Sequence, residues 1–113
     1  MMEIIVDYKE DIAIVRLVGE LDISTVDYFC NKLTTIKKDY SKMIFDFFKV
    51  EFVDSTALSR IIKLLKDEEE IRYAITHLQA DMYEIMETLN LKEVLGEEVF
   101  IYTTEEAIKY LNR

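Results

Sequence analysis

One short segment of the chain places a carboxylate and two hydroxyls at the start of a predicted helix. Asp54, Ser55 and Thr56 follow a β-type apolar run, and apolar residues recur at helical spacing after them. The first backbone N–H groups of a helix are unpaired and lie at the positive end of its dipole, so an anion is stabilised there. The segment could therefore present a hydroxyl, or a phosphate on it, to solvent. The simpler interpretation is that these side chains only cap the helix.

A second acidic segment, Gly19-Glu20-Leu21-Asp22, precedes another predicted helix, which Asp22 or Ser24 can cap. If both acidic segments follow parallel strands, they meet at the carboxyl edge of one sheet, where α/β folds gather their sites. Glu20, Asp22 and Asp54 could act as acid and base. However, neither segment has a nearby His or a glycine-rich phosphate loop. We therefore expect a binding module without enzymatic activity, and nucleotide binding is disfavoured.

The remaining pattern predicts the elements that position these two segments. Apolar runs bounded by polar residues predict strands, and apolar residues at helical spacing predict helices. Strand-type runs occupy residues 2–8, 12–18, 43–48, 50–53, 71–76 and 99–102. Apolar helical faces are formed within Ile23–Ile36, Ala57–Leu65, Met82–Leu89 and Ala107–Leu111. Alternation of strands and helices after an initial hairpin predicts an α/β fold: one domain, residues 1–113, with a mixed sheet of about five strands and four helices.

Composition narrows the range of partners. The chain has 14 basic and 23 acidic side chains, a net charge of −9, so we expect neither nucleic-acid nor membrane-surface binding. No apolar run reaches a membrane-spanning length, and no signal peptide is apparent. Cys30 and His77 are the only Cys and His, too few for a metal site of these ligands. A single cysteine cannot form a disulfide within the chain, and the absence of disulfides is typical of proteins in the reducing cytosol. We expect no cofactor, a packed thiol at Cys30, and a solvated turn at Asp67–Glu70.

Three motifs resemble those of the STAS domain, the fold of bacterial anti-sigma factor antagonists. The segment Val18–Asp22 resembles the Gly-Glu-Leu-Asp element of that family. The spacing of Asp46, Val50 and Asp54-Ser55 resembles its Asp-Leu-x-x-Val-x-x-x-Asp-Ser block. The segment Glu105–Ile108 resembles its closing Glu-Glu-Ala-Leu helix. The motifs occur in the family's order along the whole chain.

This resemblance implies a partner switch. In the family, the unphosphorylated antagonist binds an anti-sigma factor serine kinase, which releases a sigma factor. The kinase then phosphorylates the Ser after the motif Asp, and a serine phosphatase reverses the reaction. Carried onto this chain, the phosphorylated residue is Ser55, with Thr56 as the alternative. The implied partner-binding residues are Glu20, Asp22, Asp54, Thr56, Ala57 and Ser59. A monomer suffices for this role.

The chain departs from the family pattern where Ala57 and Ser59 replace two glycines. Both residues favour helix more than Gly does, and their added side chains are expected to crowd an approaching kinase. A second interpretation therefore stays open: a STAS scaffold or transporter-associated module that binds partners without a phosphorylation cycle. For Asp46, which interrupts an apolar strand, the sequence leaves two alternatives: an edge-facing charge, or a hydrogen bond to a nearby loop.

Overall fold

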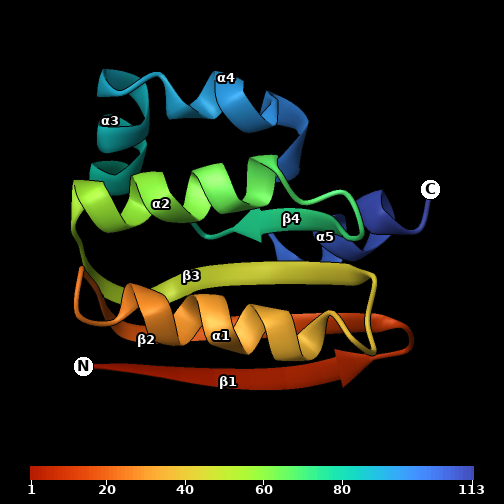
Figure 1. Cartoon of the computed structure of the whole chain (residues 1–113). Helices are drawn as coiled ribbons and strands as arrows, with labels where there is room; N and C mark the ends of the chain where they lie inside the picture. The colour runs from red at the N-terminus through yellow and green to blue at the C-terminus, as the bar shows by residue number, and fades with distance from the viewer.

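The computed structural model of the protein describes residues 1–113, which form one five-stranded sheet with helices on both faces (Figure 1). The strands lie in the order β1-β2-β3-β4-β5. β1 is antiparallel to β2, and all other neighbouring strands are parallel. The strands are β1 (Met2–Lys9), β2 (Ile12–Leu21), β3 (Lys42–Val53), β4 (Arg72–Thr76) and β5 (Phe100–Ile101). The helices are α1 (Val26–Ile36), α2 (Ser55–Lys66), α3 (Ala80–Thr88), α4 (Leu91–Leu95) and α5 (Thr104–Leu111), and a 3-10 turn spans Glu97–Val99. The predicted α/β fold with a mixed sheet is confirmed.

The main hydrophobic core lies between the sheet and the layer formed by α1 to α4. Alternate residues of β2 and β3, such as Val15, Leu17 and Phe45, point into this layer and are buried with Phe29 of α1 and Ile61 of α2. The amphipathic pattern predicted for these helices thus corresponds to their buried faces.

The opposite face of the sheet is covered only in part. Ala107 and Leu111 of α5 pack on Ile12, Ile14 and Ile44 near the amino ends of β2 and β3. Figure 1 shows α5 behind the sheet and α1 and α2 in front of it. The half of this face toward the carboxyl ends of β2 and β3 has no helix over it, and we call it the open face.

Helix α1 begins at Val26, later than predicted. The Asp22 carboxylate accepts hydrogen bonds from the backbone N–H groups of Ser24 and Thr25, which forms a local turn before the helix. Ile23 therefore lies outside the helix, and 72% of its surface is exposed. Its assignment to the apolar helical face was wrong.

Strand and helix limits differ elsewhere for similar local reasons. The two apolar runs at 43–48 and 50–53 form one continuous strand, β3, and the last strand has only Phe100 and Ile101 because Val99 belongs to the 3-10 turn. Helix α3 ends before Leu89, which is exposed, since Asn90 has a positive φ of 54°. The short helix α4 was not predicted.

The acidic run Asp67–Glu70 is not wholly a solvated turn. The side chain of Glu68 is mostly buried, and its carboxylate accepts hydrogen bonds from the backbone N–H of Glu70 and the ammonium of Lys37, both at 3.0 Å. These two contacts lower the pKa of Glu68. The hydrogen bond with Glu68 also raises the pKa of Lys37. Glu68 therefore joins the ends of α1 and α2.

Candidate functional site

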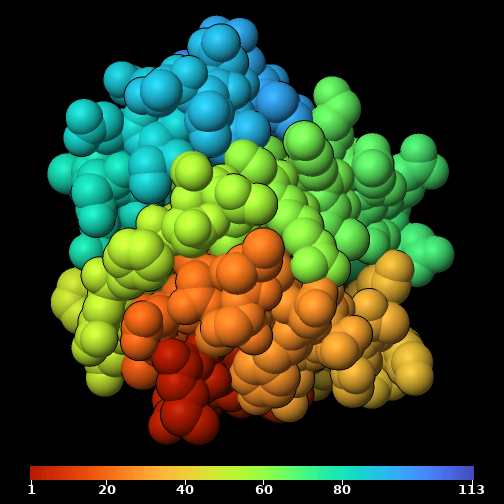
Figure 2. All heavy atoms as spheres, turned by 60° about the vertical axis from the view of Figure 1, so that its left-hand side comes forward, coloured from red at the N-terminus to blue at the C-terminus, as the bar shows by residue number.

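The two acidic segments meet at the carboxyl edge of the sheet, as predicted. Leu21 and Val53 are partners in the parallel register of β2 and β3, and the backbone N–H of Asp54 donates to the carbonyl of Leu21 at 2.8 Å. Figure 2 turns this edge toward the viewer: the start of α1 (orange) and the β3–α2 junction (yellow-green) adjoin one another, with α3 (cyan) above. We call this surface the carboxyl-edge face.

Asp54 is the cap of α2. One carboxylate oxygen, Oδ1, accepts hydrogen bonds from the backbone N–H groups of Thr56 at 2.8 Å and Ala57 at 3.1 Å. The simple capping interpretation therefore holds for Asp54. It does not account for Ser55, whose side chain is exposed at the first position of the helix. Because Asp54 already supplies the cap, the Ser55 hydroxyl is available for another role.

Asp22 organises the neighbouring loop. Its Oδ1 accepts hydrogen bonds from the Ser24 hydroxyl at 2.6 Å, the Ser24 backbone N–H at 2.9 Å and the Thr25 backbone N–H at 3.1 Å. The bonds from Ser24 and Thr25 hold the pKa of Asp22 below its ordinary value. Thr25, which the sequence did not single out, is buried and donates to the Glu20 carbonyl at 2.8 Å. The loop is thus fixed by side-chain bonds.

Gly19 provides the bend before this loop. Its φ is +106°, a conformation that side chains disfavour, and a Cβ atom there would overlap the carbonyl oxygen of Met1. The following residue, Glu20, is exposed, and its carboxylate lies 3.3 Å from the terminal ammonium of Met1. The glycine of the motif is therefore required by the backbone.

The other residues expected to bind a partner differ in exposure. Thr56 is exposed and Ser59 is half-buried, while Ala57 is 1% exposed and belongs to the main core. The Ala57 side chain is thus not part of the surface. Its methyl group is buried and cannot crowd an approaching kinase. The expectation that Ala57, in place of a family glycine, hinders the kinase was therefore wrong.

Exposed apolar side chains surround the two junctions. Ile23 follows Asp22 and is 72% exposed, and Phe52, two residues before Asp54, is 51% exposed. Leu89, beyond α3, is 44% exposed and shares a hollow with Ser55. Sequence reasoning missed all three as surface residues, because an apolar side chain is assigned to the core by default. Leu89 lies in the same hollow as Ser55, while Ile23 and Phe52 lie within two residues of Asp22 and Asp54 along the chain. Exposed apolar side chains near the two junctions favour protein binding.

The hollow beside Ser55 is acidic on its far wall. It has a volume of about 430 Å³, and α3 contributes Asp81, Glu84 and Ile85 to its lining. A phosphate on Ser55 would therefore enter a surface that already carries carboxylates at Asp54, Asp81 and Glu84. No group of three His, Cys, Asp or Glu side chains is placed to hold a metal ion. None of the helices has the length and apolar character needed to cross a bilayer.

A family model described as the STAS domain matches residues 3–108. The chain therefore belongs to the STAS domain family, and the resemblance of its motifs is confirmed. A search of curated proteins found no match.

Solved structures with this fold come from two groups of proteins. An anti-sigma factor antagonist from Mycobacterium paratuberculosis has a TM-score of 0.84 at 15% identity, with 100% of this chain and 96% of that chain covered. The unphosphorylated form of the anti-sigma factor antagonist SpoIIAA has a TM-score of 0.75 at 19% identity, with 97% and 96% covered. A sulfate transporter family protein from Wolinella succinogenes has a TM-score of 0.77 at 16% identity, with 94% and 88% covered. At these identities the likeness establishes the fold.

Proposed function

We propose that this protein is an anti-sigma factor antagonist controlled by phosphorylation of Ser55. In its unphosphorylated state it binds an anti-sigma factor serine kinase through the carboxyl-edge face, and a sigma factor is released. Phosphorylation of Ser55 ends this binding, and a serine phosphatase restores it. The protein acts as a cytoplasmic monomer, and it is a ligand and substrate without catalytic activity of its own.

One observation carries the proposal: the exposed hydroxyl of Ser55 lies within a face that is otherwise built for contact. Asp54 caps α2, so the Ser55 hydroxyl is not needed for the cap, and the exposed side chain of Leu89 leaves apolar surface in the same hollow open to a partner. The solved phosphorylated form of the Bacillus protein SpoIIAA, with a TM-score of 0.69, shows that a protein of this fold accepts such a modification.

The physical basis of the switch is the cost of burying a dianion. A phosphate adds about −1.5 to −2 charge, and in an interface beside apolar or acidic side chains it acts through desolvation and repulsion. Here the hollow that contains Ser55 is also lined by Ile85, by the exposed Leu89 and by the carboxylates of Asp81 and Glu84. A loss of about 3 kcal/mol of binding free energy lowers affinity roughly a hundredfold. The fold itself is expected to persist, because an anion at a helix start is favourable.

The test is phosphorylation by the cognate kinase. The protein is incubated with ATP and the anti-sigma factor kinase purified from its own cells, and the peptides are analysed by mass spectrometry. We expect one phosphate, on Ser55, in the wild type and in Thr56→Ala, and none in Ser55→Ala. Equal phosphorylation of Ser55→Ala and the wild type would assign the modification to another residue such as Thr56.

A transporter-associated scaffold is the second candidate, since STAS structures of the sulfate transporter family share this fold. Capture of partners from the native cell separates the two functions. Recovery of a serine kinase and loss of that kinase with Ser55→Asp support the switch. Recovery of a membrane transporter whose binding is the same for wild type and Ser55→Asp supports the scaffold.

A further inference from the structure

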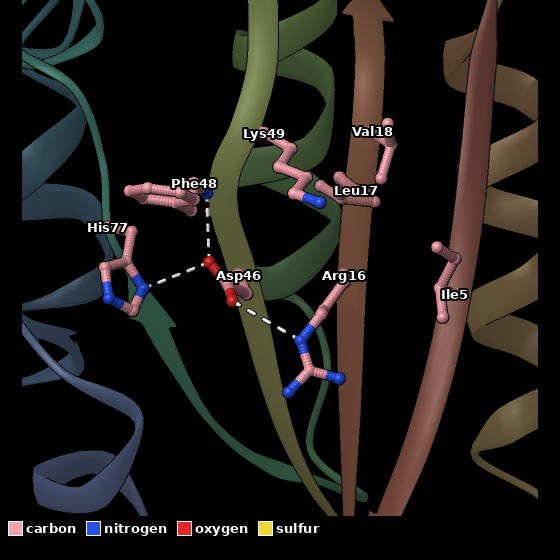
Figure 3. Close-up of a pocket in the computed structure, with 8 residues that line it drawn as sticks. All are labelled: Ile5, Arg16, Leu17, Val18, Asp46, Phe48, Lys49 and His77. Atoms are coloured by element: carbon pink, nitrogen blue, oxygen red, sulfur yellow. Dashed lines mark hydrogen bonds and ion pairs between the residues drawn. The ribbon is translucent and has the colours of Figure 1, made fainter.

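A second hollow lies on the open face of the sheet, away from α1 and α2. It has a volume of about 310 Å³, at the lower end of the range for small-molecule sites. Figure 3 shows its lining side chains, which come from β1, β2, β3 and the residue after β4. Apolar atoms of Ile5, Val18 and Phe48 form part of the wall, and the ring of Phe48 is 67% exposed.

A buried carboxylate organises the polar side of this hollow. Asp46 is 8% exposed, and its Oδ1 accepts hydrogen bonds from the Phe48 backbone N–H at 2.9 Å and from His77 Nδ1 at 3.0 Å. Its Oδ2 lies 3.8 Å from Nε of Arg16. The sequence left open whether Asp46 is an edge-facing charge or forms a hydrogen bond to a nearby loop. The hydrogen bond is correct, because His77 is the residue that follows β4. Asp46 thus holds Arg16 and His77 in place, and the guanidinium of Arg16 offsets part of its negative charge.

Two cationic side chains remain available to a ligand. The guanidinium of Arg16 also pairs with Asp7 at the rim, but it has five N–H donors and the two carboxylates do not engage all of them. Lys49 takes part in none of the ion pairs of the structure. In Figure 3 its ammonium turns from β3 toward β2, next to Leu17, while the guanidinium of Arg16 points the other way, toward Asp46. Other lysines of the chain, such as Lys63, are also unpaired, but Lys49 is the lysine that lines this hollow.

We propose that this hollow binds a small organic carboxylate with an apolar body. The carboxylate is bound by the ammonium of Lys49, since charge-assisted hydrogen bonds are the strong ones, and Arg16 adds a second positive charge to the lining. The apolar body packs against Ile5, Val18 and Phe48. Charge complementarity selects an anion, and the apolar wall distinguishes an organic anion from an inorganic one. The site is separate from the carboxyl-edge face and does not depend on the proposed partner switch.

The experiment uses benzoate as the probe and backbone amide NMR shifts of the full chain as the readout. We expect benzoate to shift the amides of Val18, Phe48 and Lys49 in a saturable manner, and its neutral isostere benzamide to bind at least about tenfold more weakly. Lys49→Gln weakens benzoate binding about tenfold. The matched control is Lys63→Gln, an exposed lysine of α2 on the other side of the sheet, which leaves the affinity unchanged.

Three results would overturn the proposal. Benzamide binding as tightly as benzoate would show that the cations play no part. Inorganic phosphate binding at this hollow as tightly as benzoate would show that the apolar wall does not contribute. Shifts that spread over the whole surface, or that Lys49→Gln and Lys63→Gln reduce equally, would indicate general attraction of anions. Lys49 is exposed, so its variant is expected to fold, and its amide spectrum verifies this directly.

Discussion

Replacing Ser55 by Asp separates the electrostatic account of the switch from a structural one. The variant places one permanent negative charge at the first position of α2, where the hydroxyl is exposed and Asp54 already provides the cap. A carboxylate in the first turn of a helix stabilises it by about 0.3–1 kcal/mol. The carboxylates of Asp54, Asp81 and Glu84 oppose this gain by a similar small amount, because exposed charges interact weakly. The free energy of unfolding is therefore expected to change by less than about 1 kcal/mol.

The effect on binding is expected to be much larger. At about 4 Å from a like charge of the partner, near a surface, the added charge costs on the order of 4 kcal/mol before salt screening. A net loss of about 3 kcal/mol corresponds to roughly a hundredfold weaker kinase binding. Calorimetric titration measures the affinity, and thermal unfolding measures the stability, where about 1 kcal/mol corresponds to roughly 4 °C in Tm.

The matched control is Ser41→Asp, which adds the same charge at an exposed serine next to the amino end of β3. This control is expected to leave both Tm and kinase affinity close to wild type. The reasoning would be refuted if Ser55→Asp unfolded or lost more than about 10 °C in Tm. It would also be refuted if Ser55→Asp bound the kinase as tightly as the wild type does, because Ser55 would then lie outside the interface.

Three further predictions concern the elements that hold the site. Asp54→Ala removes the cap of α2 and is expected to cost about 1 kcal/mol in urea unfolding, whereas Asp54→Asn, which can still cap, costs less; equal losses would contradict a capping role. Gly19→Ala, at φ +106°, is expected to cost about 1–3 kcal/mol, and a neutral result would show that the bend relaxes. Glu68→Gln is expected to cost about 1 kcal/mol at pH 7. Since the pKa of Glu68 is lowered in the fold, this difference is present above its ordinary value of 4.5 and disappears as the pH falls through the lower folded value. Unfolding at pH 7 and pH 3 measures it, and a constant difference would contradict the ionic contact.

The strengths of sequence reasoning here lie in local interactions. The cap at Asp54 involves residues within a few positions, so residue type alone indicated it. The helix cap predicted at Asp22 or Ser24 was wrong, because Asp22 forms a turn before α1 and no side chain caps that helix. The order of strands and helices followed from apolar periodicity in the same way. The meeting of the two acidic segments followed from one further rule, that parallel strands end at a common edge of the sheet.

Features that depend on the exact path of the backbone or on distant residues were missed. Ile23 has the spacing of a buried helical residue, yet the turn at Asp22 places it on the surface. The contact of Asp46 with His77 joins residues 31 positions apart and exists only because β3 and β4 are neighbours. The hollow on the open face depends on how far α5 extends across the sheet, and no local pattern sets that limit.

The amino-acid sequence by itself determined the order of the elements, the cap at Asp54 and the membership of the STAS family, because these depend on residue type, spacing and motif. Only the tertiary structure decided which side chains share a surface. It buried Ala57, exposed Ile23 and Phe52, placed Leu89 in one hollow with Ser55, and gathered Arg16, Asp46, Lys49 and His77 around another. The physical reason is that burial and charge compensation are properties of packed neighbours, and the packing of strands and helices brings together residues that are far apart along the chain.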